Sequence, residues 1–317
     1  MTDIPHREDG TPPVATLRLA NQPVTLRTKH PTTSPGAGLH RRQRTLHHTA
    51  KPAPGTQLAD IWILTKRIVM RLRRRPDVIV YSFIQPALFT LATVFVFAGA
   101  IKLPGGGSYA EFAICGMLAQ TIVLATSHTA CALALDIHDK VLDRLRILPV
   151  ARSSILAGFT NAGLMHSLIT VLITIGCGYL AGWRAHNGIG SAAAAIALLL
   201  LFGLAMSWLG ALIGVSVSSP EAAAGAGSIW LFPFMYLSNA LAPVQSMPVW
   251  VQYVAEYNPV SAIASACRQL FGNPAPPAVH QTLVTDHPIA TSIVWSLAII
   301  AAVMPLSIRK FMAAASR

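Results

Sequence analysis

The sequence predicts an all-α, polytopic membrane protein with six transmembrane helices, an N-terminal interfacial helix and both termini in the cytoplasm. Three observations lead to this fold class: a high apolar content, a shortage of charge, and the gathering of that charge near the N-terminus. Of the 317 residues, 53% are apolar and only 11% are charged, whereas soluble domains carry about 25% charged residues. Residues 1–77 hold 14 of the 24 Lys and Arg, so the rest of the chain has too few charges to cover a surface in water. The composition therefore excludes a soluble enzyme.

Residues 1–55 are predicted to form a disordered, basic cytoplasmic tail. They are rich in Pro, Thr, His and Arg and show no apolar periodicity. Such a composition cannot bury enough apolar surface to offset the chain entropy that folding removes. His40, His47 and His48 offer metal ligands in this tail, but scattered histidines in a disordered segment rarely form a site.

Residues 56–76 are predicted to form an amphipathic helix in the membrane interface. Apolar residues recur at spacings of three and four between Leu58 and Leu72, and basic residues lie between them. A helix with one apolar face and a basic rim lies on the membrane rather than across it, and its arginines are expected to contact anionic lipid headgroups. Pro76 ends this helix. The candidate interface residues are Trp62, Arg67, Arg71 and Arg74.

Residues 77–312 are predicted to form the transmembrane domain. They contain six apolar stretches, each close to the roughly 20 residues that cross the hydrocarbon core: 78–100, 112–134, 157–181, 192–217, 225–241 and 289–308. After the fifth stretch, Trp250, Tyr253 and Tyr257 suit a helical excursion that does not span the membrane, because aromatic side chains gather at the interface. Residues 313–317 form a short cytoplasmic C-terminal tail.

The distribution of basic residues sets the orientation. With the N-terminus inside, 21 of the 24 Lys and Arg fall on the cytoplasmic side, and only Lys102, Arg184 and Arg268 fall outside. This split follows the positive-inside rule. The net charge of +12 is also compatible with nucleic-acid binding, but sorting by membrane side explains the same residues. No nucleic-acid partner is therefore expected.

The chemistry that the sequence lacks points to an external energy source. There is no GxxxxGK[ST] loop for ATP phosphates, and neither HExxH nor GxSxG is present. The spans contain almost no ionisable residue, whereas ion-coupled transporters place such groups near the membrane midplane. The four cysteines form no pair with metal-ligand spacing. No cofactor or metal site is predicted in this chain.

A few polar side chains lie inside the predicted spans. They can line a substrate path, or they can join helices through hydrogen bonds worth about 0.6 kcal/mol each, and the sequence leaves both interpretations open. The candidates for a translocation path are Gln85, Gln120, His128, Asn161 and Asn239.

The loop 136–153 (DIHDKVLDRLRILPVARS) is long and charged for a connection between two spans. Its charged residues alternate with Leu142, Leu145, Ile147 and Leu148 at helical spacing. A merely solvated loop does not need these apolar residues, whereas a short cytoplasmic helix that docks on a soluble partner does.

The order of these features resembles the membrane subunit of ABC-2 type exporters, and particularly the daunorubicin-resistance group of drug and lipid exporters. The resemblance covers about 56–312, nearly everything after the tail. The stretches that carry it are 73–86, 109–121, 136–158, 218–234 and 238–272. In two places the sequence departs from the family pattern: Cys115-Gly116 stands where Pro-Gly is usual, and Val141 stands where Gly is frequent.

The resemblance implies roles for several segments. The loop 136–153 is similar to the coupling segment that docks on a cytoplasmic ABC ATPase subunit, and the interfacial helix is expected to touch that subunit too. Within the extracellular helices of 242–272, the matching residues are Asn258, Pro259 and Arg268. The implied coupling residues are Asp136, Asp139, Leu142, Asp143, Arg144, Leu145 and Pro149.

The sequence thus predicts a permease subunit that moves amphipathic drugs or lipids across the plasma membrane and is not itself an enzyme. ATP and Mg²⁺ would be bound by the partner ATPase, and the permease would pair with an identical or similar chain. Two alternatives stay open: a membrane enzyme acting on lipid through Asp136, His138 and Glu256, and an ATP-independent channel or scaffold.

Overall fold

The computed structural model describes residues 65–66, 70, 76–99, 101, 103, 106–139, 152–277 and 279–314. All of these belong to the unit formed by residues 50–317. The predicted N-terminal tail, nearly all of the predicted interfacial helix and residues 315–317 lie outside the described residues.

The described part of the chain is helical and contains no strand. Four helices, α3, α5, α6 and α11, are long and apolar enough to cross a membrane. This confirms a helical membrane protein, and the other two predicted spans correspond to α2 and α7. In chain order the elements are α2 (Pro76–Phe97), α3 (Tyr109–His138), α5 (Arg152–Leu180), α6 (Gly188–Ser216), α7 (Pro220–Tyr236), the 3₁₀ turn η1 (Val244–Ser246), α8 (Val249–Tyr257), α9 (Pro259–Phe271), α10 (Leu283–Asp286) and α11 (Pro288–Ala314).

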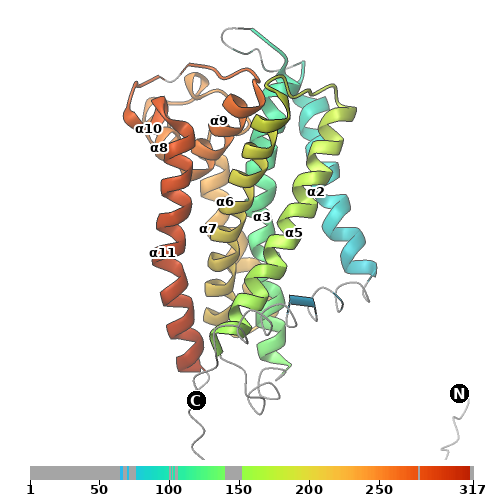
Figure 1. Ribbon diagram of the computed structural model, residues 1–317, viewed down its shortest axis with the longest axis vertical. Coiled ribbons are helices and arrows are strands. Elements are labelled where there is room, and N and C mark those ends of the chain that lie inside the picture. Colours follow the sequence, from blue (N-terminus) through green and yellow to red (C-terminus); the bar gives the residue numbers. More distant parts are fainter. Residues whose placement is uncertain are drawn as a thin grey trace, which may run out of the picture. The chain divides into compact units, whose positions relative to one another are not determined.

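α3 is the central helix of the bundle (Figure 1). It packs against α2, α5, α6, α7 and α9. In its apolar stretch 67% of the residues are buried, against 11% in α11. α3 is therefore the core around which the other helices are arranged, while α11 leaves most of its apolar surface uncovered, as a lipid-facing helix does.

Small residues let α6 approach α3 closely. Gly210 and Gly214 lie one turn apart on α6, and a Cβ atom on either would overlap a backbone oxygen of α3, that of Thr126 or of Ala130. Helices in membranes associate through such small residues because these allow the two backbones to come together. The α3–α6 pair thus depends on glycine at both positions.

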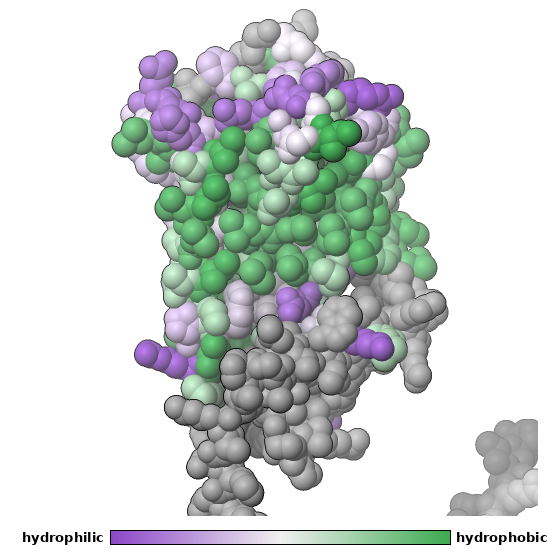
Figure 2. Space-filling model, viewed as in Figure 1, coloured by the Kyte–Doolittle hydropathy of each residue, from purple (hydrophilic) through white to green (hydrophobic). Residues whose placement is uncertain are grey.

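On the face drawn in Figure 2, the described surface carries an apolar belt. Apolar side chains cover the middle of the bundle, and polar side chains gather at the end where α8, α9 and α10 lie. We call this the α9 end, and we call the end that contains the last turn of α3 the opposite end. With 9 and 13 residues, α8 and α9 are too short to cross the hydrocarbon core.

Candidate functional site

A buried arginine joins three elements at the α9 end. Arg268 of α9 is 1% exposed. Its Nε donates to the Phe112 carbonyl on α3 at 3.3 Å, and its Cζ lies 3.8 Å from the centre of the Phe112 ring, which is a cation–π contact. Nη1 donates to Asn239 Oδ1 at 3.2 Å, and Nη2 donates to the carbonyls of Asn239 at 2.9 Å and Ala240 at 3.2 Å. One side chain therefore ties α9 to the first turn of α3 and to the turn after α7.

Arg268 keeps its charge in this buried place. Burial lowers the pKa of its guanidinium to about 10, which leaves the group protonated at neutral pH. Its four hydrogen bonds go to neutral oxygens, and within the described residues no carboxylate forms a salt bridge with it. The carbonyls and the ring offset the cost of removing the charge from water, but they leave the site electropositive.

Asn258 and Pro259 fix the start of α9. Asn258 Oδ1 accepts from the Val260 backbone N–H at 2.8 Å, a helix cap, and Pro259 occupies the first helical position, where no backbone donor is needed. Asn258 Nδ2 donates to the carbonyls of Phe234 and Leu237 at 2.8 and 2.7 Å. The Asn-Pro pair thus begins α9 and satisfies the end of α7.

Asn239 is the one predicted path residue that the structure places in this network. Besides accepting from Arg268, its Nδ2 donates to Ser265 Oγ at 2.9 Å and its backbone N–H donates to Ser261 Oγ at 2.9 Å. The structure therefore brings together Asn239, Asn258 and Arg268, which the sequence assigned to two different groups.

A cavity of about 300 Å³ lies between α9 and the α9–α11 connection, residues 272–287. Three of its lining residues, Ser261, Ser265 and Arg268, lie on one face of α9, because they are four and three positions apart. Glu256 and Asp286 also line it. The lining is thus mixed: one buried cation, two carboxyl groups and two serine hydroxyl groups lie among apolar residues.

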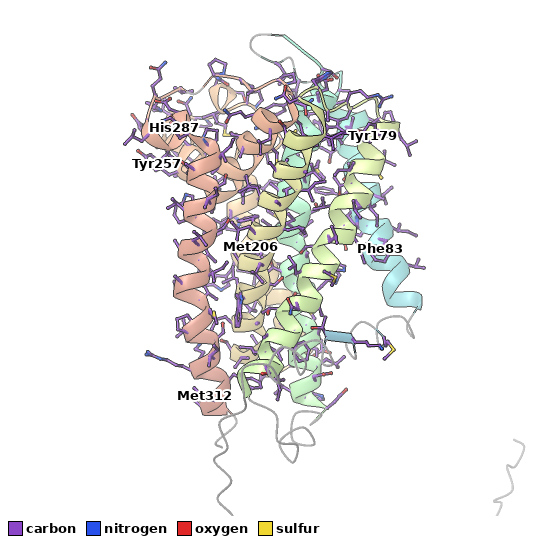
Figure 3. All side chains as sticks on the ribbon, viewed as in Figure 1. Phe83, Tyr179, Met206, Tyr257, His287 and Met312 are labelled. Carbon is purple, nitrogen blue, oxygen red and sulfur yellow. The ribbon has the colours of Figure 1, made fainter. Side chains whose placement is uncertain are left out.

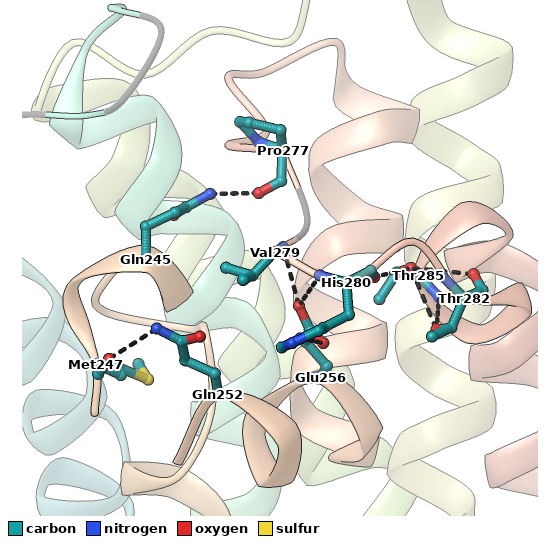
Figure 4. A network of polar contacts seen from close by, with 9 residues as sticks. All are labelled: Gln245, Met247, Gln252, Glu256, Pro277, Val279, His280, Thr282 and Thr285. Atoms are coloured by element: carbon teal, nitrogen blue, oxygen red, sulfur yellow. Dashed lines mark hydrogen bonds and ion pairs between the residues drawn. The ribbon is translucent and has the colours of Figure 1, made fainter. Parts of the chain in front are cut away.

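A single carboxylate holds the α9–α11 connection in place (Figure 4). Glu256 of α8 is buried. Its Oε1 accepts from the backbone N–H groups of Val279 and His280, both at 3.0 Å, and its Oε2 lies 2.9 Å from His280 Nδ1. The His280 ring also stacks on Tyr253, with 4.2 Å between ring centres. Gln245 donates to the Pro277 carbonyl nearby. α8 therefore anchors the connection mainly through Glu256.

Replacing Glu256 by Ala is expected to release this connection. Hydrogen bonds to a charged group contribute about 1.5–3 kcal/mol, so the Val279 and His280 amides should exchange with deuterium roughly tenfold or more faster. Hydrogen–deuterium exchange mass spectrometry of the purified chain measures this. Glu111→Ala is the control, because among the described residues the only hydrogen bond of the Glu111 carboxylate is to the exposed His186 ring, at 2.8 Å. Unchanged exchange in Glu256→Ala would show that the carboxylate does not hold the connection.

The other predicted path residues lie on three helices, α2, α3 and α5. Gln85 is exposed on α2, and Asn161 is half-buried on α5. His128 of α3 is exposed, and its ring lies 4.7 Å from that of His166. The His166 ring in turn stacks on that of Phe83, with 6.1 Å between ring centres; Phe83 is labelled on α2 in Figure 3. The histidines thus belong to an aromatic cluster between α2, α3 and α5.

Gln120 lies in the packed core between α3 and α7. It is 1% exposed, and its Nε2 donates to the Met235 carbonyl at 3.3 Å. Its Oε1 has no hydrogen-bond partner among the described residues. In a single chain, Gln120 therefore joins two helices through a hydrogen bond, which is the alternative to a place in the substrate path.

At the opposite end, the structure reaches the first part of the predicted coupling segment. Asp136 is buried on α3, and Asp139 is exposed, with its carboxylate 3.5 Å from His138 Nδ1. Leu142, Asp143, Arg144, Leu145 and Pro149 lie outside the described residues, as do Trp62, Arg67, Arg71 and Arg74 of the interfacial helix.

The structure separates the residues of the lipid-enzyme alternative. Asp136 and His138 lie in the last turn of α3, whereas Glu256 lies at the α9 end, close to where α3 begins. A helix rises 1.5 Å per residue, so Asp136 is about 36 Å along α3 from Phe112. The three side chains form no common site, and this alternative, as drawn from the sequence, is wrong. Among the described residues no cluster of three or more His, Cys, Asp or Glu has the arrangement of a metal site.

Comparison with known proteins assigns the family. Residues 59–271 match the family described as ABC-2 type transporter, which covers most of the bundle and the site around Arg268. The chain belongs to the ABC-2 type transporter family. It is therefore a multi-pass membrane permease.

Three relatives of this permease are named as permeases. It is 31% identical over 220 residues to a daunorubicin resistance ABC transporter permease protein of Streptomyces coeruleorubidus, covering 69% of this chain and 77% of the relative. It is 28% identical over 230 residues to a putative transport permease of Porphyra purpurea, covering 68% and 75%. A probable doxorubicin resistance ABC transporter permease protein of Mycobacterium tuberculosis is 23% identical over 223 residues, covering 68% and 80%.

The Cys115-Gly116 pair, which stands where Pro-Gly is usual in the family pattern, lies at a close contact in this ABC-2 permease. A Cβ atom on Gly116 would overlap the carbonyl oxygen of Ala240, so α3 and the turn after α7 touch at this glycine. Cys115 Sγ lies 3.3 Å from Asn273 Oδ1, which also accepts from Trp183 Nε1 at 2.8 Å. The pair thus packs α3 against the turn after α7 and against the start of the α9–α11 connection.

Sequence reasoning missed several polar residues of this permease. Ser261 and Ser265 could have been found from the sequence, because their spacing from Arg268 places all three residues on one helical face. His280 carries none, since it lies 24 positions from its partner Glu256 in a segment without periodicity. Asn273 follows the αL cap Gly272 (φ +72°) and has no distinctive neighbours in the sequence.

Proposed function

We propose that this chain is the membrane subunit of an ABC exporter that moves amphipathic drugs or lipids outward across the plasma membrane. ATP hydrolysis by a separate nucleotide-binding subunit would drive the movement. The observation that carries the proposal is the family match over residues 59–271, together with relatives named for resistance to daunorubicin and doxorubicin. The spans offer almost no fixed charge to select an ion, which favours amphipathic cargo.

In this proposal α2 and α7 complete a set of six spans, with the α9 end outside. At 1.5 Å per residue the 22 residues of α2 extend about 33 Å, enough for the hydrocarbon core. The 17 residues of α7 extend about 25 Å, and the chain up to residue 241 supplies the remainder. The concentration of Lys and Arg in residues 1–77 and 135–156 supports a cytoplasmic opposite end, with residues 1–55 and 313–317 as cytoplasmic tails.

The ATPase would dock on the loop 136–153, which follows directly from α3. Asp136 and Asp139 begin the segment, and Leu142, Asp143, Arg144, Leu145 and Pro149 continue it. The chain has no phosphate-binding loop of its own, so ATP and Mg²⁺ would bind the partner. The interfacial helix, with Trp62, Arg67, Arg71 and Arg74, would support the same contact and bind anionic lipid.

A second permease, identical or similar, would pair with this chain through α2 and α7. Both helices present large apolar side chains to the surroundings, including Leu88 and Phe95 on α2 and Ile229 and Trp230 on α7. Among the proposed path residues, Gln85 and His128 are exposed in the single chain. They would face the path only in the pair.

Replacing both Asp143 and Arg144 by Ala is expected to abolish ATP-dependent transport and reduce co-purification with the ATPase at least about tenfold, since charged contacts of docking helices set specificity and lifetime. The assay co-expresses the chain with candidate ATPase subunits, then measures pull-down and drug or lipid flux in proteoliposomes. Arg309→Ala is the matched control, because Arg309 is exposed on α11 outside the loop. Nucleotide-independent flux by the chain alone would contradict the proposal and favour the channel alternative.

A further inference from the structure

The cavity beside α9 presents hydrogen-bond donors on its α9 wall. The hydroxyl oxygens of Ser261 and Ser265 accept from Asn239. A serine hydroxyl also carries one hydrogen to donate, and within the described contacts neither serine donates it. Both serines line the cavity, so their hydroxyl groups are available as donors to a ligand there.

Arg268 adds the charge to this wall. A guanidinium has five N–H groups, and the four described bonds of Arg268 occupy four of them. The fifth belongs to Nη1. Because Arg268 lies on the same face of α9 as the two serines and lines the same cavity, the wall combines a cation with two hydroxyl donors. Such a set is complementary to a negatively charged oxygen.

Among the described contacts, the two carboxyl groups of the cavity form no hydrogen bond with this wall. Both oxygens of Glu256 are occupied by donors of the α9–α11 connection, namely the Val279 and His280 amides and the His280 ring. Asp286 is exposed at the last turn of α10. Gln245 contributes an acceptor instead: its Oε1 is buried and has no partner among the described residues, so it suits a hydroxyl on the same ligand.

We propose that this cavity is a binding site for an oxyanion of headgroup size, held by Arg268, Ser261 and Ser265. Its volume of about 300 Å³ lies at the small end of ligand pockets. The phosphate of a lipid headgroup and a soluble phosphate share this chemistry. Binding requires neither ATP nor a partner subunit, so the assignment is independent of the proposed transport.

The test uses the full chain purified in a maltoside detergent, which contributes no phosphate. Isothermal titration calorimetry measures binding of two probes, inorganic phosphate and dihexanoyl phosphatidic acid. We expect saturable binding of at least one. Ser265→Asp retains an acceptor for Asn239 but places a negative charge beside Arg268, so it should weaken binding about tenfold or more. Ser246→Asp adds the same charge at an exposed serine of the α9 end that does not line the cavity, and it should bind as the unmodified chain does.

Each outcome either tests the proposal or identifies the source of the bound oxyanion. Binding of the lipid alone identifies a headgroup site, binding of phosphate alone identifies a soluble oxyanion, and either supports the assignment. Absence of saturable binding of both probes to the folded chain overturns it, as does equal binding by Ser265→Asp. Where Ser265→Asp fails to fold, the Ser261→Ala/Ser265→Ala double variant removes both hydroxyl donors without adding a charge, although it also removes the acceptors for Asn239. It should weaken binding to a similar degree, and unchanged affinity in a folded double variant also overturns the assignment.

Discussion

Arg268→Gln is expected to lower the melting temperature of the purified permease by roughly 6–12 °C, corresponding to about 3 kcal/mol. Glutamine offers two N–H donors in place of five, so at least one of the buried carbonyls of Phe112, Asn239 and Ala240 loses its partner. Each orphaned carbonyl costs about 1–3 kcal/mol. It also removes the contact of the guanidinium with the Phe112 ring. Thermal unfolding followed by tryptophan fluorescence measures the change.

Arg184→Gln is the control for this loss. Arg184 also donates to two carbonyls, at 3.0 and 2.8 Å, and lies over the Tyr179 ring at 5.3 Å, but it is exposed to solvent. Water can replace the hydrogen bonds of Arg184, so the melting temperature of the Arg184→Gln variant should differ from that of the unmodified chain by less than about 2 °C. Equal shifts in the two variants would contradict a structural role for the buried arginine.

Gly116→Ala is expected to abolish folding or to destabilise the permease by several kcal/mol, more than the roughly 1–3 kcal/mol typical of an overpacked core. The added methyl group meets the Ala240 carbonyl, which is backbone and cannot rotate away as a side chain can. α3 must then separate from the turn after α7, and the Arg268 hydrogen bonds to Asn239 and Ala240 break with it. The yield of monodisperse protein and its melting temperature report the effect.

Gly176→Ala makes the same chemical change in α5, where an added Cβ atom meets nothing within 4 Å. Alanine favours the helix over glycine by up to about 1 kcal/mol, so this variant should be unchanged or slightly more stable. A comparable loss in both variants would mean that glycine is needed for flexibility rather than for close approach.

Membrane spans are the part of the fold that the sequence predicts well. The stretch 192–217 corresponds to α6, Gly188–Ser216, and 289–308 lies within α11, Pro288–Ala314. The bilayer imposes both a length and a composition, so a hydropathy pattern locates these helices. It misses their ends: α3 continues past the predicted 134 to His138, because backbone hydrogen bonding carries the helix into charged residues that the apolar pattern does not register.

The site around Arg268 is the part of the structure that could not be predicted from the sequence. Counting charges by membrane side treats Arg184 and Arg268 alike, yet the first is exposed and the second is 1% exposed. The difference arises from contacts across the bundle, since Arg268 meets Phe112 at a sequence separation of 156. Asn239 likewise becomes part of the site only when α7 and α9 fold together. Such pairings follow from three-dimensional packing and leave no local pattern.

The central position of α3 makes it a lever between the two ends of the permease. Its 30 residues form a rod about 45 Å long, and a tilt of 5° about its midpoint displaces each tip by about 2 Å in opposite directions. In the proposed transport cycle the ATPase pushes on the loop that continues from one tip. The other tip carries Phe112, which contacts the Arg268 guanidinium and lines the cavity beside α9. A tilt of α3 driven by the ATPase would therefore change the width of this cavity.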